Sequence, residues 1–331
     1  MIDLHTHSNI SDGELNPAHL AEKAALLGLK ALALTDHDAI SGLEEAEKAA
    51  KIHKMYFIPG VELEIQPELQ FGEICNKLAS SFSPKPKAAF SKTEVLKKPQ
   101  LAGGFSGPKI MEINGEFHLL GLGIDRLNRE FLAFLEYQSE ARKRRNLKMV
   151  EKIRSAGIQI DYGEIKAIVG KTAKHDKGLI GRPHFADFLV SRKIVKTHGE
   201  AFKRWLGKGK PFYAAKEGVE LGEAVRLIHQ AGGAAVLAHP MSLYVSWGRM
   251  PGLLAFFKEK GLDGVEAWHP NARVNDCKRL EELGRSLGLF ITAGSDFHGQ
   301  SRPERKLGYT AGNQKIGDEF LEGFLAYTQR I

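Results

Sequence analysis

Short apolar runs alternate with segments of helical periodicity along most of this 331-residue chain. The apolar runs predict strands at Ile2–His5, Lys30–Thr35, Met55–Glu62, Phe117–Ile124, Ala234–His239, Gly264–His269 and Leu289–Ser295. The periodic segments predict helices at Pro17–Leu27, Ser41–Lys51, Glu220–Gln230, Gly252–Lys260 and Ala272–Leu287. This alternation is typical of parallel strands joined by crossover helices, so we expect an α/β fold, either a barrel or an open sheet.

Two stretches interrupt the alternation. Residues 68–109 are rich in Ser, Lys, Pro and Ala, which predicts a mobile loop, although Phe71–Phe82 could form a short helix. The second stretch carries a long helical pattern through Ala156 and then shorter helical pieces around Tyr162–Val169 and Arg182–Ser191. We interpret it as a helical insertion, so the expected organisation is a first part of the main fold, the insertion and a second part, over residues 1–125, 126–211 and 212–331.

The composition narrows the class of protein. With 43% hydrophobic and 26% charged residues, the chain has the balance of a globular protein with a sizeable core. Two cysteines, Cys75 and Cys277, are too few for a disulfide framework or a cysteine-based zinc cluster. No apolar run approaches the roughly 20 residues of a membrane span, and polar residues begin at Asp3, where a secretory leader would still continue. We therefore expect a cytoplasmic protein with no membrane partner.

Basic residues are concentrated in the middle of the chain. The net charge is +7, but residues 125–215 hold 21 Lys and Arg against 10 Asp and Glu. The rest of the chain is slightly acidic, with 26 basic and 30 acidic residues. Such a segment favours an anionic partner, although a solvated basic surface would give the same pattern.

Histidines and carboxylates gather where the predicted strands end. Asp3-Leu4-His5-Thr6-His7 places two imidazoles at positions i and i+2, and Asp12 follows in a loop. The later groups are Thr35-Asp36-His37-Asp38, Gly60-Val61-Glu62, Ala238-His239-Pro240, Trp268-His269-Pro270 and Ser295-Asp296-Phe297-His298, and Phe117-His118 begins a further strand. In a parallel barrel the C-terminal strand ends meet on one face, where active sites lie. One such histidine is usually a structural residue, but its repetition at one face favours a metal site.

The ligand types indicate which metals and which chemistry. Imidazole nitrogens and carboxylate oxygens without thiolates suit Mn, Fe or Zn with open coordination positions. One ion needs about four protein ligands, so the candidate set could hold two or three divalent ions if a carboxylate bridges them. Ions roughly 3.5–4 Å apart suit in-line displacement at phosphorus. The candidate ligands are His5, His7, Asp12, His37, Glu62, His118, His239, Asp296 and His298.

In order and approximate spacing, these motifs resemble those of the PHP (polymerase and histidinol phosphatase) superfamily. The match covers residues 1–65, 115–125 and 232–310. The chain is similar to the stand-alone branch with a helical insertion after the fourth strand, whose members act as nucleoside 3′,5′-bisphosphate phosphatases, 5′-nucleotidases or 5′→3′ exonucleases on short RNA. The resemblance implies a distorted seven-stranded β/α barrel, a (β/α)7 barrel with a helical insertion domain, and up to three metal ions.

The resemblance also implies how the ligands are shared. One ion would take His5, His7, Glu62 and Asp296, a second would take Asp12, His37 and His298, and a third would share Glu62 with His118 and His239. Glu62 is thus the expected bridge, and the expected catalytic residues are Glu62, Asp296 and His269. His269 could serve as the general acid for the leaving group, or it could only pack beside Trp268. Asp36 and Asp38 are expected either to orient ligands or to cap the following helix.

Basic motifs in the insertion are candidates for substrate binding. Arg142 and Arg145 lie three apart on one face of the long predicted helix. Arg182 and His184 open another helix, whose N-terminal amides would add to an anion site. Both patterns recur in the nucleotide-acting branch, where such residues hold a second phosphate, and guanidinium groups suit that ligand. A solvated helix face and an ordinary helix start are the simpler alternatives. We expect these four residues, together with His269, to contact the substrate.

Together these features predict a metal-dependent phosphoesterase in which an activated hydroxide attacks phosphorus. The expected substrate is a nucleoside 3′,5′-bisphosphate or the 5′ end of a short RNA, with phosphate as a product and the insertion covering the substrate. The alternatives are a histidinol-phosphate-type phosphatase, a barrel amidohydrolase and a metal-binding remnant with an RNA-binding or regulatory role. The basic insertion argues against a small cationic substrate, and the Asp296-Phe297-His298 ending argues against an amidohydrolase.

Overall fold

The computed structural model describes residues 1–66, 113, 115–172 and 179–329. The predicted loop at 68–109 and the short helix considered at Phe71–Phe82 lie outside these residues. Within the described part of the chain, no helix has both the length and the apolar character needed to cross a lipid bilayer.

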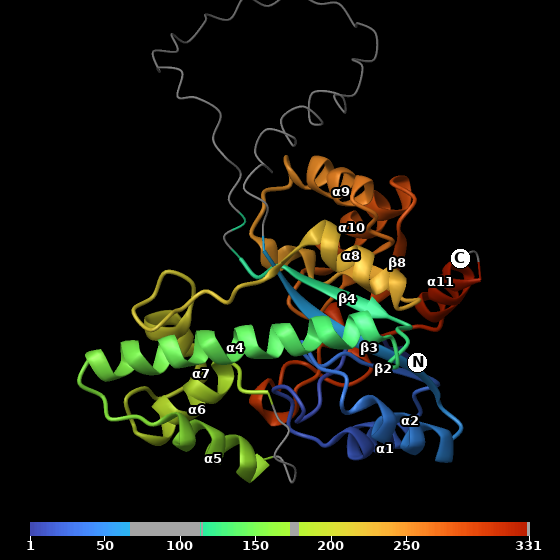
Figure 1. The fold of residues 1–331 in the computed structure, drawn as a ribbon. Coiled ribbons are helices and arrows are strands. Elements are labelled where there is room, and N and C mark those ends of the chain that lie inside the picture. Colours follow the sequence, from blue (N-terminus) through green and yellow to red (C-terminus); the bar gives the residue numbers. More distant parts are fainter. Residues whose placement is uncertain (67–112, 114, 173–178, 330–331) are drawn as a thin grey trace, which may run out of the picture.

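Seven strands of an eight-stranded sheet form a nearly closed barrel (Figure 1), and the eighth, the short β5 (Val219–Glu220), pairs with β3 outside that path. The first and last strands meet, because Leu4 N donates to Ala293 O at 3.3 Å and Thr6 forms a parallel bridge with Phe297. The expected distorted seven-stranded α/β barrel is therefore confirmed. In spatial order its strands are β1 (Ile2–Asp3), β2 (Ala31–Leu34), β3 (Tyr56–Gln66), β4 (His118–Leu122), β6 (Ala234–Leu237), β7 (Gly264–Trp268) and β8 (Phe290–Ala293).

Strand β4 is the exception to the parallel arrangement that the alternation predicts. This strand runs antiparallel to both of its neighbours, with Gly60 opposite Leu122 on β3 and Leu122 opposite Ala234 on β6. The other pairs in the barrel are parallel. Because β4 runs in reverse, its first residue, His118, lies at the edge where the parallel strands end. This explains why a candidate ligand begins a strand here instead of closing one.

The predicted helices are present with small shifts at their ends, as α1 (Pro17–Leu26), α2 (Leu43–Ile52), α8 (Leu221–Gln230), α9 (Met250–Glu259) and α10 (Val274–Ser286). Asn16 caps α1 by accepting a hydrogen bond from His19 N at 2.8 Å, and Pro17 fits the first turn. Figure 1 shows α1 and α2 on one side of the sheet and α8, α9 and α10 on the other.

Several short elements and one helix were not predicted. The helix, α11, packs Phe320 and Phe324 into the main hydrophobic core. The others are too short to carry a periodic pattern that would predict them. The added elements are β5 (Val219–Glu220), β9 (Tyr309–Thr310), β10 (Gln314–Lys315), α11 (Glu319–Thr328) and three single turns at Pro240–Leu243, Gly299–Ser301 and Ala311–Asn313.

The helical segment between β4 and β6 has a hydrophobic core of its own. Its largest fully buried side chains are Phe185, Phe188 and Phe212, and they pack with Ile153 of α4. Since this core is separate from that of the barrel, the segment is held together by its own packing. Its elements are α4 (Arg129–Ser155), α5 (Tyr162–Thr172), α6 (Arg182–Ser191), α7 (His198–Ala201) and a π-helical turn at Phe202–Leu206.

Candidate metal centre and anion site

Four predicted ligands meet at the carboxyl edge of the barrel. His5 and His7, which follow β1, bring their Nε2 atoms within 3.1 Å of each other. His7 Nε2 lies 3.2 Å from both Glu62 Oε2 and Asp296 Oδ1, and His5 Nε2 lies 3.4 Å and 3.5 Å from the same two oxygens. All four side chains are buried. Two imidazole nitrogens and two carboxylate oxygens at this spacing could hold one divalent ion.

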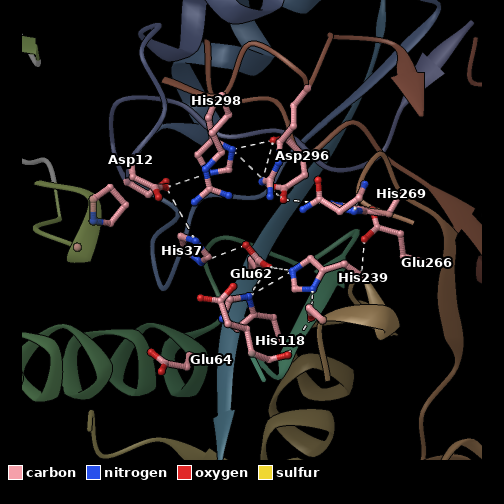
Figure 2. Close-up of a pocket in the computed structure, with 18 of the residues that line it drawn as sticks. Asp12, His37, Glu62, Glu64, His118, His239, Glu266, His269, Asp296 and His298 are labelled. Carbon is pink, nitrogen blue, oxygen red and sulfur yellow. Dashed lines mark hydrogen bonds and ion pairs between the residues drawn. The ribbon is translucent and has the colours of Figure 1, made fainter. Parts of the chain in front are cut away.

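A second group forms around the other oxygen of Glu62. Glu62 Oε1 lies 2.8 Å from His118 Nδ1 and 2.9 Å from His239 Nε2, and the two imidazole nitrogens are 3.3 Å apart. Figure 2 shows Glu62 between these rings and His37. The carboxylate thus presents one oxygen to each group, which is the geometry that a bridging ligand requires.

A third group contains Asp12, His37 and His298. Asp12 Oδ1 lies 3.3 Å from His298 Nε2 and 3.9 Å from both His37 Nε2 and His7 Nδ1. Asp12 Oδ1 and His298 Nε2 are buried and have no hydrogen-bond partner among the described residues. Buried polar atoms without partners are costly unless a ligand engages them. These two atoms face each other, so they fit a cation bound between them.

Three residues with strained backbone and one glycine set the geometry of the ligand groups. Asp38, His239 and Asp296 have positive φ angles of 50°, 29° and 50°, a conformation that costs non-glycine residues about 1–3 kcal/mol. Gly294 lies against β1 so closely that a Cβ atom there would be 2.3 Å from the Cβ of His5. Only glycine therefore lets β8 approach the His5 backbone at this point.

Glu266 connects two of the ligand groups and was not predicted as a site residue. It lies in the middle of β7 and is 1% exposed. Its Oε1 is 3.0 Å from His5 Nδ1, and its Oε2 accepts a hydrogen bond from His239 N at 2.8 Å. Such partners fix the orientation and tautomer of metal-binding imidazoles. The signal in the sequence was a single acidic residue within the apolar run 264–268.

Asp36 and Asp38 hold loops in place and do not cap α2. Asp36 accepts hydrogen bonds from Ser8 N at 2.8 Å, Ser8 Oγ at 2.6 Å and Ser11 Oγ at 2.7 Å, which fixes the loop that carries Asp12. Asp38 forms ion pairs with side chains from the insertion and from the segment that follows it. The residue at the start of α2 makes no side-chain cap. Of the two predicted roles, the structure favours orientation.

The protonation states around the centre suit metal ligands. Although burial opposes ionisation, His298 and His37 hold the pKa of Asp12 well below its usual value. Burial lowers the pKa of His37 to about 3, so this imidazole is neutral at neutral pH. His5, His7 and His118 differ. Against the effect of burial, Glu266 and Asp296 raise the pKa of His5 well above its ordinary value. Likewise against burial, Asp296 and Glu62 raise the pKa of His7 to about 9, and Glu62 raises that of His118. A metal ion binding at His5 must therefore displace a proton.

Asp296 is anchored through its second oxygen. Asp296 Oδ2 lies 3.1 Å from His269 Nε2 and forms a buried ion pair with Arg305. Because His269 Nδ1 accepts a hydrogen bond from Asn271 N at 3.2 Å, the ring proton lies on Nε2 and faces Asp296. Burial lowers the pKa of His269, which lines the cavity described below. Its roles as a general acid and as a substrate contact remain predictions. Arg305 was missed because no motif marks it.

Arg142 and Arg145 both line this cavity from α4, and both are buried. Arg142 forms an ion pair with Asp38. Arg145, 3% exposed, donates from Nε to Asn146 Oδ1 at 2.9 Å, but its Nη2 has no hydrogen-bond partner and no carboxylate of the described residues forms an ion pair with it. Burial and the charge of Arg142 lower the pKa of Arg145 to about 9. A buried guanidinium without a counter-ion favours an anionic ligand.

Arg182 and His184, at the start of α6, are placed differently. Arg182 lines the cavity, donates to Glu116 Oε1 at 2.9 Å and lies 5.8 Å from the ring centre of Phe202 and 5.9 Å from that of Tyr213. His184 turns back onto its own helix, where its Nδ1 accepts a hydrogen bond from Gly181 N at 2.9 Å. The structure does not bring His184 to the cavity wall, and its predicted contact with substrate stays a prediction.

One cavity of about 190 Å³ joins the ligand groups to the arginines. Figure 2 shows the labelled histidines and carboxylates converging on it. Arg142, Arg145 and Arg182 line its other part, and Arg302, which the sequence analysis did not single out, lies near the ligands. The candidate metal ligands and the guanidinium groups therefore face the same cavity.

This combination of barrel, ligand groups and arginines defines a metal-dependent phosphoester hydrolase. The PHP domain model matches residues 3–180. A 5′-3′ exoribonuclease of Haemophilus influenzae is 30% identical to this chain over 296 residues, and the match covers 89% of each protein. A 3′,5′-nucleoside bisphosphate phosphatase of Chromobacterium violaceum is 29% identical, and the match covers 93% of this chain and 91% of that protein. The chain belongs to the PHP family, as its motifs predicted.

Solved structures agree with this fold. An amidohydrolase from Chromobacterium violaceum, with bound sulfate and no metal, has a TM-score of 0.74 at 27% identity, and the match covers 97% of this chain and 96% of that one. A Bifidobacterium adolescentis protein assigned as a metal-dependent phosphoesterase also has a TM-score of 0.74, at 24% identity, covering 98% of this chain and 96% of its own.

Proposed function

We propose that this protein hydrolyses a phosphate ester of a nucleotide that carries a second phosphate group, such as a nucleoside 3′,5′-bisphosphate or the 5′ end of a short RNA. The observation that carries the proposal is Arg145, a buried arginine that has no counter-ion among the described residues and shares a cavity with the candidate metal ligands. The names of the Haemophilus and Chromobacterium relatives support this substrate class.

The three ligand groups are proposed to hold two or three divalent ions, with Mn, Fe and Zn as the candidates. Such ions would polarise the phosphoryl oxygens and lower the pKa of a bound water from about 15.7 toward 7. Despite burial, neighbouring histidines lower the pKa values of Asp12 and Glu62, and Glu266 fixes the His5 ring through Nδ1 and the His239 backbone through its N–H. These contacts prepare the site before substrate binds.

The arginines would orient the substrate. Arg145 and Arg182 are proposed to bind the second phosphate, which places the reacting phosphate near Glu62 and Asp296 in the same cavity. Because the arginines come from α4 and α6, the insertion would cover the bound substrate. Hydrogen bonds from a guanidinium to a phosphate are charge-assisted and can be bidentate, so they fix direction as well as position.

The alternatives fit the cavity less well. Histidinol phosphate carries an ammonium group, which would meet the positive charges of Arg145 and Arg182 when its phosphate lies among the ligands. A cyclic phosphate diesterase of Eggerthella lenta, named for phosphoribosyl 1,2-cyclic phosphate, is 27% identical over 90% of this chain. That relative acts on a phosphate ester too, so it extends the range of phosphoester substrates to be tested. Amide hydrolysis gives the buried arginines no role.

The test is phosphate release with Mn²⁺ from adenosine 3′,5′-bisphosphate, AMP and histidinol phosphate. Arg145→Met should raise KM for the bisphosphate about 30-fold, because one charge-assisted contact is worth about 1.5–3 kcal/mol, and should change the rates with AMP little. Arg144→Met is the matched control, since this neighbouring side chain is 44% exposed and pairs with Glu217. Equal losses with bisphosphate and AMP, or a wild-type preference for histidinol phosphate, would contradict the proposal.

A further inference from the structure

A buried ionic cluster lies behind the arginines and joins separate parts of the chain. Lys216, in the segment that returns from the insertion to the barrel, has a side chain that is 0% exposed. Its Nζ lies 2.7 Å from Asp38 Oδ2 and 3.7 Å from Glu64 Oε2. Arg142 of α4 pairs with the same oxygen of Asp38. The cluster therefore links the loop after β2, strand β3, helix α4 and the segment before β5.

The charges in this cluster leave one cation over. Asp38 and Glu64 supply the negative charge, since Arg142 and Lys216 both pair with Asp38 Oδ2 and Lys216 also reaches Glu64 Oε2. Three buried cations face them, Lys216, Arg142 and Arg145, while a further cation, Arg182, pairs with Glu116. With Lys216 and Arg142 both paired with Asp38, Arg145 is the cation of this cluster that forms no ion pair with a carboxylate of the described residues.

Removing Lys216 would change that balance. Asp38, which is buried, and Glu64, which is 29% exposed, would then face only the arginines. Glu64 and Arg145 line the same cavity, so Arg145 is an available replacement for the lysine. A buried carboxylate such as that of Asp38 is strongly unfavourable when it loses a partner, which gives Arg145 a reason to turn toward the two carboxylates and away from a bound phosphate.

We propose that Lys216 is a positioning residue that keeps Arg145 available for the second phosphate by neutralising Asp38 and Glu64. This inference rests on the proposed function. The cluster also fixes the distance between the arginines and the ligands, because Asp38 follows His37 and its backbone N–H donates to Glu62 O at 2.9 Å. Replacing buried ion pairs by apolar groups is often neutral for stability, so stability alone gives little reason to bury this lysine.

The experiment compares Lys216→Met with Lys210→Met, an exposed lysine of the same segment, and with Arg145→Met. Lys216→Met should raise KM for adenosine 3′,5′-bisphosphate about tenfold, less than the effect of Arg145→Met because the guanidinium would be displaced and not removed, while kcat/KM for AMP and the bound metal content stay near those of the wild type. Lys210→Met should leave all of these unchanged. Two further variants restore the charge balance: Lys216→Arg, and the double variant Lys216→Met with Glu64→Gln. In each, KM for the bisphosphate should return most of the way to the wild-type value.

The outcomes separate the two proposals. If Arg145→Met selectively weakens the bisphosphate but Lys216→Met does not, the role of Lys216 is refuted and the proposed function stands. If Lys216→Met lowers Tm and impairs both substrates equally, the lysine is only structural, and the inference again fails. If Arg145→Met shows no selectivity, the proposed second-phosphate site fails, and the role of Lys216 fails with it.

Discussion

Glu62 is the side chain on which the candidate metal centre depends most, and Glu62→Gln removes one carboxylate oxygen while keeping the shape. Oε2 faces His5, His7 and His37 at 3.4, 3.2 and 3.1 Å, and Oε1 faces His118 and His239 at 2.8 and 2.9 Å. An amide NH2 placed at Oε1 could donate to both of the imidazole nitrogens there. Placed at Oε2, it would face three nitrogens with two hydrogens. We therefore expect the amide nitrogen at Oε1.

That orientation predicts a graded loss of metal. The remaining amide oxygen still faces His5 and His7 beside Asp296, so those ligands keep a weaker site. The group of His118 and His239 loses its carboxylate and should lose its ion. We expect metal content to fall by about one ion per chain without reaching zero, and kcat to fall about 10³-fold, a barrier increase of about 4 kcal/mol at 1.36 kcal/mol per tenfold change.

The assay measures metal per chain by inductively coupled plasma mass spectrometry and phosphate release from adenosine 3′,5′-bisphosphate. Glu44→Gln is the control, because this glutamate is exposed on α2 and pairs only with Lys48 in the structure. Full metal occupancy together with near-normal turnover in Glu62→Gln would refute the bridging role. Loss of every ion would show instead that the three groups bind their metals as one unit.

Three other predictions concern pH, packing and metal removal. The hydrogen bond to Asp263, at 2.7 Å, raises the pKa of His229, so this pair should stabilise the fold fully below about pH 6.5 and lose its effect as pH rises through the folded-state pKa. His229→Gln should accordingly cost about 0.5 kcal/mol in urea unfolding at pH 5.5 and nothing at pH 9; a cost independent of pH would contradict this. Gly294→Ala should weaken metal binding, because the added methyl group would displace His5. Gly222→Ala is the control, since Gly222 has open space around it. Equal metal contents in the two variants would show that the close approach of Gly294 to His5 is unimportant. EDTA should abolish phosphate release, and metal at 100 times its Kd should raise the free energy of unfolding by about 2.7 kcal/mol; activity that persists in EDTA would exclude a metal-dependent reaction.

The barrel could be predicted because its strands and helices carry strong local patterns. Each predicted strand is present in the sheet, and each named helix is present with ends shifted by at most a few residues. Strand direction is not a local property, which is why the reversal of β4 was missed. An apolar run such as 118–122 reads the same in either direction, and only its pairing with β3 and β6 fixes its orientation.

The candidate ligands could be predicted because they stand in short motifs next to strand ends. Their supporting residues could not, since they lie far away in the sequence: Glu266 contacts His5 across 261 positions, and Lys216 contacts Asp38 across 178. No window of sequence contains both partners of such a pair. Arg145 stood in a visible motif, but Arg144 beside it looks the same in sequence. Only the packing of α4 shows which of the two is buried.

The distribution of charge supports the proposal that the substrate carries a second phosphate. The ligands include three carboxylates, Asp12, Glu62 and Asp296, so two divalent ions would leave that edge with a net positive charge. Across the cavity, Arg145 has no counter-ion in the part of the chain that the structure describes, while Arg182 pairs with Glu116. A substrate with phosphates at both ends would neutralise both regions. An ammonium group at the far end would instead lie beside Arg145, where like charges about 4 Å apart repel by about 4 kcal/mol at an effective dielectric constant near 20, nearly a thousandfold in affinity. Selection by charge at the far end therefore follows from the buried arginine itself.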